Sequence, residues 1–182
     1  YTHVVDYIQG SEVPGRVDPM TGNPILRWEN FSHVNLFGVD AEAGYTINEY
    51  VGLRGYLSYV RGYNESTNDD LYRIMPLHGA IALDLGYGPF SLTPEVVMAA
   101  RQDDVASYNG ERPTSGWAVF NLSGSYTLRE GARIVIGVEN VLGERYALHT
   151  NGVNQVQQSD VAMGRRIPEA GRFFYAGVTL AY

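Results

Sequence analysis

Hydrophobic positions alternate with small or polar positions along much of the chain, most clearly near its end. Every second residue from Phe174 to Leu180 is apolar, and those between them are small or amphipathic. The same two-residue period runs through 116–128, 80–87 and 39–47. A helical period of 3.6 residues fits none of these windows. The pattern therefore predicts an all-β, antiparallel fold.

Turn signals divide the alternating windows into about eight predicted strands. We expect these strands near residues 1–9, 25–47, 50–63, 77–87, 90–102, 116–129, 132–146 and 171–182. Three connections are tight turns, at Asn48-Glu49, Gly88-Pro89 and Glu130-Gly131. The others are long and rich in Gly, Pro, Asn and Asp, over 10–24, 64–76, 103–115 and 147–170. Short periplasmic turns and long external loops are typical of outer-membrane barrels, so the first strand is predicted to run outward.

Alternation alone does not say which face is inside. A soluble barrel with an apolar lumen and a β-sandwich with an aromatic core have the same period. The polar face decides in favour of a membrane barrel, because it carries mostly Ser, Thr, Asn and Gly rather than the Lys and Glu of a water-exposed surface. Its isolated charges, expected to pair in a packed or hydrated lumen, are Asp40, Glu42, Arg54, Asp84, Glu95, Arg133 and Glu139.

Aromatic residues gather near both ends of the predicted strands, as expected of rings at the two lipid–water interfaces. Beside the short turns lie Tyr45, Tyr50, Tyr87, Phe90, Tyr126 and Tyr182. Towards the long loops lie Tyr59, Tyr63, Trp117, Phe120, Tyr146 and Phe174. The sequence therefore predicts two aromatic girdles.

Composition agrees with this prediction. The 182 residues include 21 glycines and 14 tyrosines, which suit curved, closely spaced strands. Cysteine is absent, which excludes disulfides and thiolate metal sites, and the net charge of -7 argues against nucleic-acid binding. No apolar run approaches the roughly 18 to 20 residues of a membrane helix. The first residues already have strand character without an initiating Met, which suggests a cut inside a longer protein.

Several segments resemble the TonB-dependent outer-membrane receptors, over essentially the whole chain. The stretch 137–146 (GVENVLGERY) resembles the family's "GVENLFD..Y" strand, and 168–175 (PEAGRFFY) its "PGR.FY" motif before the last strand. Weaker similarities lie at 35–42 (NLFGVDAE) and 59–62 (YVRG). In that family the terminal aromatic residue is part of the signal read by the barrel assembly machinery, so Tyr182 implies an intact C-terminus.

The resemblance implies that residues 1–182 are the C-terminal part of a larger barrel, without its N-terminal plug domain, earlier strands and TonB-contacting motif. It also implies energised uptake of a ferric siderophore, another metal complex or a vitamin across the bacterial outer membrane. Expected partners are outer-membrane lipid, the TonB complex through the missing region, the assembly machinery and the ligand. A small, complete eight-stranded barrel with a structural or adhesive role is the alternative. Unpaired edge strands should keep the isolated segment from closing stably by itself.

Nothing in the sequence indicates an enzyme, and no cofactor is expected. The four histidines lack metal-hydrolase spacing, and no G-x-S-x-G nucleophile motif occurs. Glu139 and Asn140 are expected to hold neighbouring backbone or an inward-facing arginine, and Gly38 and Gly137 to permit close strand approach or a bulge.

Binding groups are expected on the long-loop side, where a receptor meets its ligand. The ligand-binding candidates are Tyr63, Asn64, Arg101, Gln102, His149 and Asp160. The candidates for contact with a metal are Met75, His78, His149 and Met163, since Met with His suits copper and carboxylates suit iron chelates.

Overall fold

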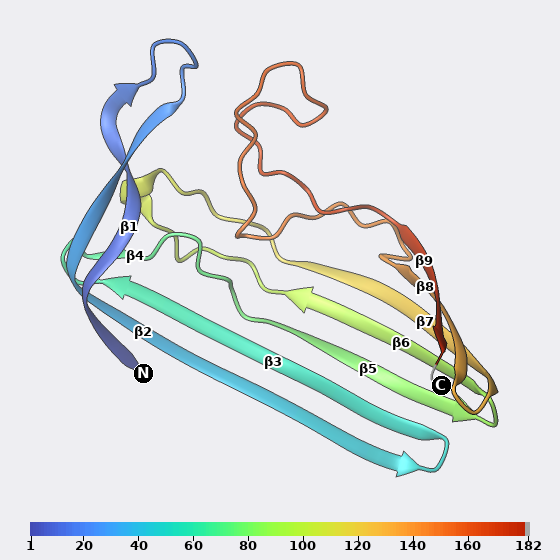
Figure 1. Cartoon of the computed structure of the whole chain (residues 1–182). Coiled ribbons are helices and arrows are strands. Elements are labelled where there is room, and N and C mark those ends of the chain that lie inside the picture. The colour runs from blue at the N-terminus through green and yellow to red at the C-terminus, as the bar shows by residue number, and fades with distance from the viewer. Residues whose placement is uncertain (181–182) are drawn as a thin grey trace.

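Nine strands and one short 3-10 helix make up the regular structure of residues 1–180, the part of the chain that the computed structural model describes (Figure 1). Their bounds are β1 (Thr2–Val17), β2 (Pro24–Asn48), β3 (Val51–Asn64), β4 (Asp69–Asp70), β5 (His78–Tyr87), β6 (Phe90–Ala99), η1 (Ser107–Asn109), β7 (Trp117–Arg129), β8 (Ala132–Glu139) and β9 (Phe173–Leu180). The predicted role of Tyr182 lies outside the described residues. Within those residues, no helix has the length and apolar character needed to cross a membrane.

The strands form one antiparallel sheet in the order β1-β2-β3-β5-β6-β7-β8-β9, with the two-residue β4 attached to β3. In the described part of the chain β1 and β9 do not pair, so the sheet is open at both edges. Figure 1 shows its long, tilted strands, with the tight turns at one end and the long connections at the other. We call these the turn end and the loop end. An open sheet is the arrangement expected of a barrel segment, and the closed eight-stranded alternative finds no support in it.

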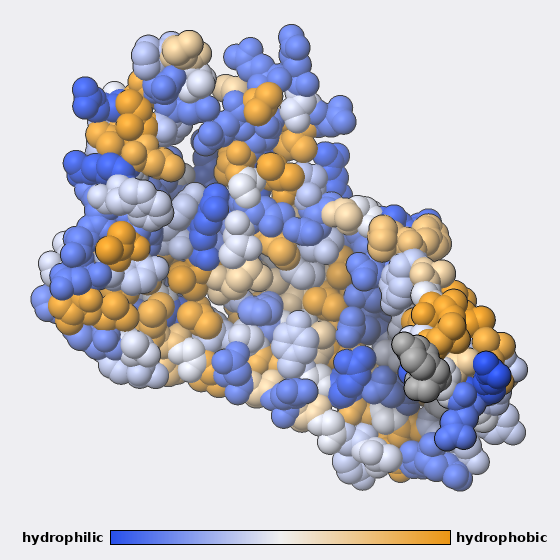
Figure 2. All heavy atoms as spheres, viewed as in Figure 1, coloured by the Kyte–Doolittle hydropathy of each residue, from blue (hydrophilic) through white to orange (hydrophobic). Residues whose placement is uncertain are grey.

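The two faces of the sheet follow the predicted alternation. Apolar side chains of one face, the apolar face, stand exposed: Ile136 is 60% exposed, Phe174 68% and Val178 65%. Figure 2 shows hydrophobic residues at the molecular surface, interspersed with hydrophilic ones. A soluble protein rarely leaves so extended an apolar surface uncovered, whereas a membrane strand turns such residues to lipid.

The opposite face, the polar face, carries the predicted isolated charges, and neighbouring strands pair them. Arg54 Nε lies 3.0 Å from Asp84 Oδ2, and Thr93 Oγ1 donates to the other oxygen of Asp84 at 3.1 Å. Asn121 Nδ2 donates to Glu95 Oε2 at 3.2 Å. The expectation that the lumenal charges pair is confirmed for these residues.

The first predicted loop, 10–24, is largely wrong, because β1 continues to Val17 and pairs with β2 up to Pro24. Pro14 and Gly15 suggested a loop, but they lie where the pairing register shifts, and Gly15 has a φ of 69°. A β-bulge thus absorbs both residues without ending the strand. The real turn is short, and Asp18 Oδ1 accepts hydrogen bonds from the main-chain N–H groups of the turn residues Met20 and Thr21.

Two predicted strands end earlier than expected, β6 at Ala99 rather than 102 and β8 at Glu139 rather than 146. Asn140 ends β8 because it adopts a left-handed conformation with a φ of 50°. Its amide side chain donates to Glu144 O at 2.7 Å and accepts from Glu144 N at 2.8 Å. The expected backbone-holding role of Asn140 is therefore confirmed, and it forms a turn instead of a strand.

The hydrophobic core is small and lies at the loop end. Phe31 and Val34 of β2 pack with Leu71, which follows β4 inside the predicted loop 64–76. A Cβ on Gly62 would lie 2.6 Å from Leu71 Cδ1, so the glycine leaves room for this leucine. The loop after β3 is thus packed onto the sheet by burial of its own apolar residue.

The predicted gathering of aromatic rings at the turn end is confirmed for the described residues, and their position at a lipid–water interface stays a prediction. The rings of Tyr50 and Tyr87 lie 5.8 Å apart, and those of Phe90 and Tyr126 lie 4.8 Å apart. At the loop end the prediction is wrong for Trp117 and Tyr146, whose rings lie 4.4 Å apart and line a pocket beside the last loop. The departure of the chain from β8 at Asn140 brings Tyr146 back towards the start of β7.

Candidate functional site

Three long connections, 65–77, 100–116 and 140–172, interlock at the loop end of the sheet. We call them together the loop layer. A carboxylate of β4 connects the first of these loops to the second. Asp69 Oδ2 accepts hydrogen bonds from Ser107 Oγ at 2.7 Å and from Tyr108 N at 2.9 Å. The loop after β3 thereby positions η1 in the loop after β6.

The helix η1 in turn docks onto β1. Asn109 Oδ1 accepts from Glu12 N at 2.7 Å, Asn109 Nδ2 donates to Gly10 O at 3.1 Å, and Gln9 Nε2 donates to Tyr108 Oη at 2.7 Å. Burial of the Tyr108 phenol, reinforced by the negative charge of Asp69, raises its pKa above the usual range. The phenol therefore remains a neutral hydrogen-bonding group, and the loop layer is fixed to the first hairpin.

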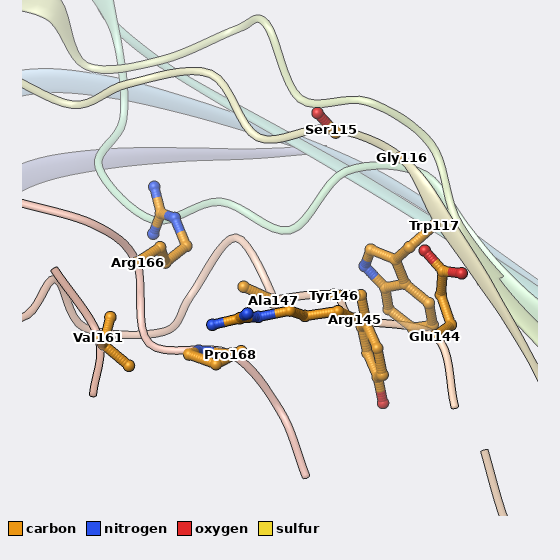
Figure 3. A pocket seen from close by; sticks show the side chains of 10 residues that line it. All are labelled: Ser115, Gly116, Trp117, Glu144, Arg145, Tyr146, Ala147, Val161, Arg166 and Pro168. Carbon is orange, nitrogen blue, oxygen red and sulfur yellow. The ribbon is translucent and has the colours of Figure 1, made fainter. Parts of the chain in front are cut away.

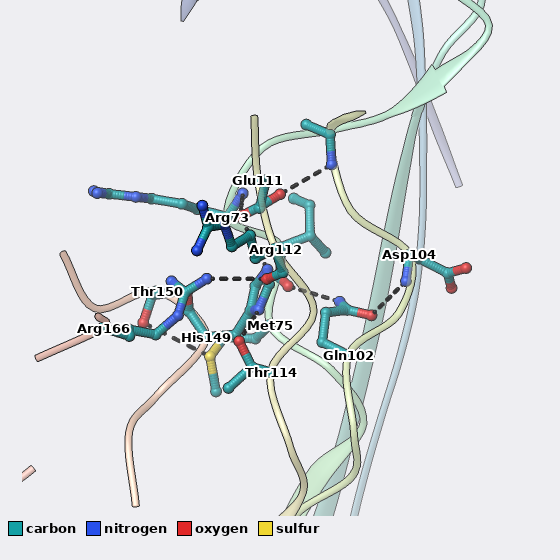
Figure 4. Close-up of polar contacts among 12 residues, drawn as sticks. Arg73, Met75, Gln102, Asp104, Glu111, Arg112, Thr114, His149, Thr150 and Arg166 are labelled. Atoms are coloured by element: carbon teal, nitrogen blue, oxygen red, sulfur yellow. Dashed lines mark hydrogen bonds and ion pairs between the residues drawn. The ribbon is translucent and has the colours of Figure 1, made fainter. Parts of the chain in front are cut away.

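A buried contact between a histidine and a carboxylate joins the second loop to the third. His149 Nε2 lies 3.0 Å from Glu111 Oε1, and both side chains are 1% exposed. In the described part of the chain Nε2 has no hydrogen-bonding partner, so this close approach is not a hydrogen bond. Glu111 also accepts from the main-chain N–H groups of Arg73 and Ala106, at 3.1 and 3.0 Å, and Thr114 Oγ1 lies 2.8 Å from His149 Nδ1. Figure 4 shows these groups converging from all three loops.

Arg166 reinforces the same junction from the third loop. Its guanidinium donates to the carbonyl oxygens of His149, of Asn151 at 2.9 Å and of Arg112 at 3.3 Å. Burial lowers the pKa of this arginine, although the guanidinium stays charged at neutral pH. The negative charge of Glu111 opposes this lowering, and the carbonyl oxygens accept the hydrogen bonds of the guanidinium.

A pocket of about 360 Å³ opens beside Arg166 (Figure 3). Its walls include the stacked rings of Trp117 and Tyr146, the side chains of Glu144 and Arg145, and Arg166. The residues that complete the lining are Ser115, Gly116, Ala147, Val161 and Pro168. We call this the loop pocket.

A smaller pocket of about 150 Å³ shares Tyr146 with the loop pocket. It reaches the polar face of the sheet at Asn121 and Glu139 and also contacts Glu169 of the third loop. Burial, and then the charges of Glu169 and Glu139, raise the pKa of the Tyr146 phenol. Tyr146 therefore presents an uncharged hydroxyl between the loop layer and the polar face.

The six ligand-binding residues predicted from the sequence do not form one cluster. Asn64, Gln102 and His149 are buried, and they hold loop structure: Asn64 Oδ1 accepts from Ser66 N at 2.9 Å, and Gln102 Nε2 donates to Ile74 O at 2.8 Å. Tyr63 Oη donates to Asn68 Oδ1 at 2.6 Å. Arg101 is exposed and pairs with Asp103 at 2.7 Å, and Asp160 is exposed. Their contact with a ligand stays a prediction.

The predicted metal contacts are likewise spread over the loop layer. Met75 Sδ lies 3.8 Å from Thr150 Oγ1, beside His149, whereas His78 Nδ1 lies 2.9 Å from Pro76 O. Met163 is 62% exposed. Over residues 1–180, no three His, Asp or Glu side chains are grouped as a metal site would require.

Sequence reasoning missed Glu111, Arg145 and Arg166 as parts of the site. Arg145 was noticed only as a letter of the 137–146 motif, and nothing in the local pattern around 111 or 166 distinguishes these residues from ordinary loop charges. Trp117 and Tyr146 were noticed, but for a membrane interface. Only the folding of the third loop against the second brings these residues together.

No protein-family model matches the sequence, and no curated protein matches it. Solved structures do resemble it. The structure of the copper transporter OprC is similar with a TM-score of 0.89 and 23% identity, over 99% of this chain and 27% of that chain. For the ferric enterobactin receptor PfeA from Pseudomonas aeruginosa the TM-score is 0.67 and the identity 21%, over 98% of this chain and 27% of that chain. For the ferric yersiniabactin uptake receptor FyuA from Yersinia pestis the TM-score is 0.61 and the identity 15%, over 85% of this chain and 24% of that chain.

This chain thus spans about a quarter of the length of the solved structures it resembles. All three are TonB-dependent receptors. The open antiparallel sheet with its exposed apolar face and interlocked loops has the fold of a segment of the β-barrel of TonB-dependent receptors.

Proposed function

We propose that the chain is the C-terminal part of the barrel of an outer-membrane uptake receptor, which imports a ferric siderophore, another metal complex or a vitamin. In this proposal the apolar face contacts lipid, the polar face lines the lumen and the loop layer faces the outside. The segment performs no covalent chemistry. It supplies a part of the barrel wall and a part of the ligand-binding surface.

The observation that carries the proposal is the opposite polarity of the two faces combined with the loop layer at one end. Apolar side chains such as Phe174 and Val178 stand exposed, while Arg54, Asp84 and Glu95 are paired on the other face. A barrel wall in a membrane requires this distribution, since lipid excludes unpaired charges. Long, ordered loops at one end suit capture of a ligand before it enters the lumen.

Uptake by the full-length protein tests this function. A strain lacking the gene should lose energy-dependent accumulation of a radiolabelled ferric chelate, Cu²⁺ or cobalamin, and the restored gene should recover it only while TonB is present. The protein should fractionate with the outer membrane. Equal accumulation of all these solutes with and without the gene would contradict the proposal.

The upstream coding sequence separates uptake from the structural or adhesive alternative. A plug domain with a TonB-contacting motif supports uptake, whereas a signal peptide directly before Tyr1 would support a small separate barrel. The open edges at β1 and β9 favour the first result, because unpaired strand edges are not tolerated in lipid.

A further inference from the structure

Two Asn-Gly pairs lie in the loop layer, Asn109-Gly110 and Asn151-Gly152. Asparagine followed by glycine is prone to lose its side-chain amide spontaneously, because glycine has no Cβ to hinder attack by its main-chain nitrogen on the asparagine Cγ. Whether the reaction proceeds depends on the contacts of the two reacting groups. These contacts differ between the two pairs.

The first pair is locked. Asn109 is 4% exposed, and its side chain donates to Gly10 O and accepts from Glu12 N. The N–H of Gly110 donates to Ser107 O at 3.1 Å, so the attacking nitrogen is also occupied. Both groups that would react are held in other contacts, and we expect this pair to be stable.

The second pair is open at the attacking nitrogen. In the part of the chain that the structure describes, the Gly152 N–H has no hydrogen-bond acceptor, and nothing lies within 4 Å of the position of a Cβ on Gly152. Asn151 and Gly152 are both partly exposed. Water can therefore reach the nitrogen, and the asparagine side chain has room to approach it.

Arg166 is bound to the peptide group that contains this nitrogen. Its Nη1 donates to the main-chain oxygen of Asn151 at 2.9 Å, and this oxygen belongs to the same peptide group as the Gly152 N–H. A cation on the oxygen makes the N–H a stronger acid, because it stabilises the negative charge that remains after the proton has left. Within residues 1–180 no arginine donates to the corresponding oxygen of Asn109.

We propose that Asn151-Gly152 is a site of spontaneous modification, at which Asn151 is converted to isoaspartate or aspartate with the help of Arg166. The Gly152 nitrogen loses its proton to hydroxide and bonds to Asn151 Cγ, while the Cγ–Nδ2 bond breaks and the amide leaves as ammonia with a proton from water. Water then opens the cyclic imide. Opening at Cγ gives aspartate, and opening at the main-chain carbon gives isoaspartate, in which the main chain runs through Cγ.

Arg166 also favours one of the two products. Its hydrogen bond is to the main-chain carbonyl, so it polarises the main-chain carbon rather than Cγ towards attack by water. Opening at that carbon leaves the former main-chain carbonyl as a carboxylate beside the guanidinium, where the two form an ion pair. The share of isoaspartate should therefore be larger in the folded protein than in the unfolded chain.

The modification alters the base of the third loop. Asn151 Nδ2 donates to Ile167 O at 3.0 Å and to Glu169 Oε1 at 2.7 Å, and Ile167 N donates to Gly152 O at 2.9 Å. Both products lose the Nδ2 donor, and aspartate in addition places a carboxylate against that of Glu169. The reaction should therefore loosen the part of the 140–172 loop that lines the loop pocket. This inference does not depend on which solute is imported.

Timed incubation of the purified full-length receptor in detergent at mildly alkaline pH tests the proposal. Peptide mapping by tandem mass spectrometry locates the products and distinguishes aspartate from isoaspartate. The same protein unfolded in urea gives the intrinsic rate of each pair. We expect folding to slow the reaction at Asn109 roughly tenfold or more and to leave Asn151 within about threefold of its rate in urea.

Matched variants isolate the role of the arginine. Arg166→Gln should slow the reaction at Asn151 roughly tenfold in the folded receptor, the effect of one charge-assisted hydrogen bond, and return the product ratio to that of the unfolded chain. A loop that the substitution merely loosened would react faster. Arg165→Gln removes a neighbouring exposed arginine and should react as the wild type does. Gly152→Ala should slow the reaction in both states, because its Cβ hinders the attack.

Each part of the proposal has a result that would overturn it. Slowing of Asn151 by folding to the same extent as Asn109 would overturn the site. An equal share of isoaspartate in the folded and the unfolded wild type would overturn the role of Arg166, and this comparison stands even if Arg166→Gln does not fold. Hydrogen exchange at the Ile167 amide should be faster in Asn151→Asp than in the wild type, and equal exchange would overturn the loosening of the loop.

Discussion

Gly79 of β5 lies so close to Tyr56 of β3 that a Cβ at position 79 would be 2.3 Å from the main-chain oxygen of Tyr56. The neighbouring Leu57 Cα would be 3.3 Å away. Main-chain atoms within a sheet do not move aside as the end of a flexible side chain does. Glycine at 79 therefore lets β3 and β5 approach each other closely at the loop end of the sheet.

Gly79→Ala should destabilise the full-length barrel by roughly 1–3 kcal/mol, the usual effect of forcing an extra carbon into a packed region. Gly86→Ala in the same strand is the matched control, since nothing lies within 4 Å of a Cβ there. The stability of both variants can be measured by denaturant unfolding in detergent, with the folded and unfolded forms distinguished by their different migration on a gel. Equal stability of the two variants would contradict the close approach.

Asn140 should tolerate few replacements. Asn140→Ala loses both hydrogen bonds to Glu144 and must adopt a left-handed conformation with a φ of 50°, which together should cost about 2 kcal/mol in local stability. Asn140→Gly avoids the conformational strain but not the loss of hydrogen bonds, so its effect should be intermediate. Protease cleavage of the 140–172 loop on whole cells should increase from the wild type to Asn140→Gly and further to Asn140→Ala, and equal cleavage of all forms would refute the role of the turn.

The Glu111–His149 contact should couple two loops energetically. In a double-mutant cycle with Glu111→Gln and His149→Gln, we expect a coupling of about 0.5–3 kcal/mol, the range for residues in contact within one network. Hydrogen exchange at the amides of Arg73 and Ala106, which donate to Glu111, reports the opening of the layer. Strictly additive effects would mean that the two side chains act independently.

Alkaline pH should reveal the environment of Tyr146. Its pKa is raised from 10.0 by burial and then by Glu169 and Glu139. The folded state holds the phenolic proton more tightly than the unfolded state, so this contribution to stability is fully present below about pH 10 and is lost as pH rises through the folded pKa. The ultraviolet difference spectrum between the wild type and Tyr146→Phe isolates its ionisation, which should occur above pH 10; ionisation at or below that value would be inconsistent with burial.

The sheet could be predicted from the sequence because each strand repeats a local rule. Alternation over 116–128 and 174–180 fixes which residues share a face, and tight turns such as Gly88-Pro89 fix the neighbours. The rule failed where one residue overrides its surroundings. The bulge at Gly15 allows β1 to continue where the sequence predicts a loop. The left-handed conformation of Asn140 ends β8, although the alternating pattern predicts that the strand continues to residue 146.

The site could be predicted only in part, since it depends on contacts between loops that are distant in the sequence. His149 was recognised as a loop residue, but its partner Glu111 lies 38 positions earlier and carries no signal of the pairing. The sequence places Trp117 and Tyr146 at a membrane interface, because ring chemistry suits such an interface and a binding pocket equally. Only the path of the 140–172 loop distinguishes the two.

The most direct test of the central claim, that this sheet is a membrane wall with its apolar face in lipid, is spin-label accessibility along β2 of the full-length protein in bilayers. Single cysteines at Val39, Ala41 and Ala43 should be reached by lipid-soluble oxygen, and those at Asp40, Glu42 and Gly44 by a water-soluble nickel chelate or by neither reagent. Uniform access of the nickel chelate to all six positions, or the reverse alternation, would contradict the account.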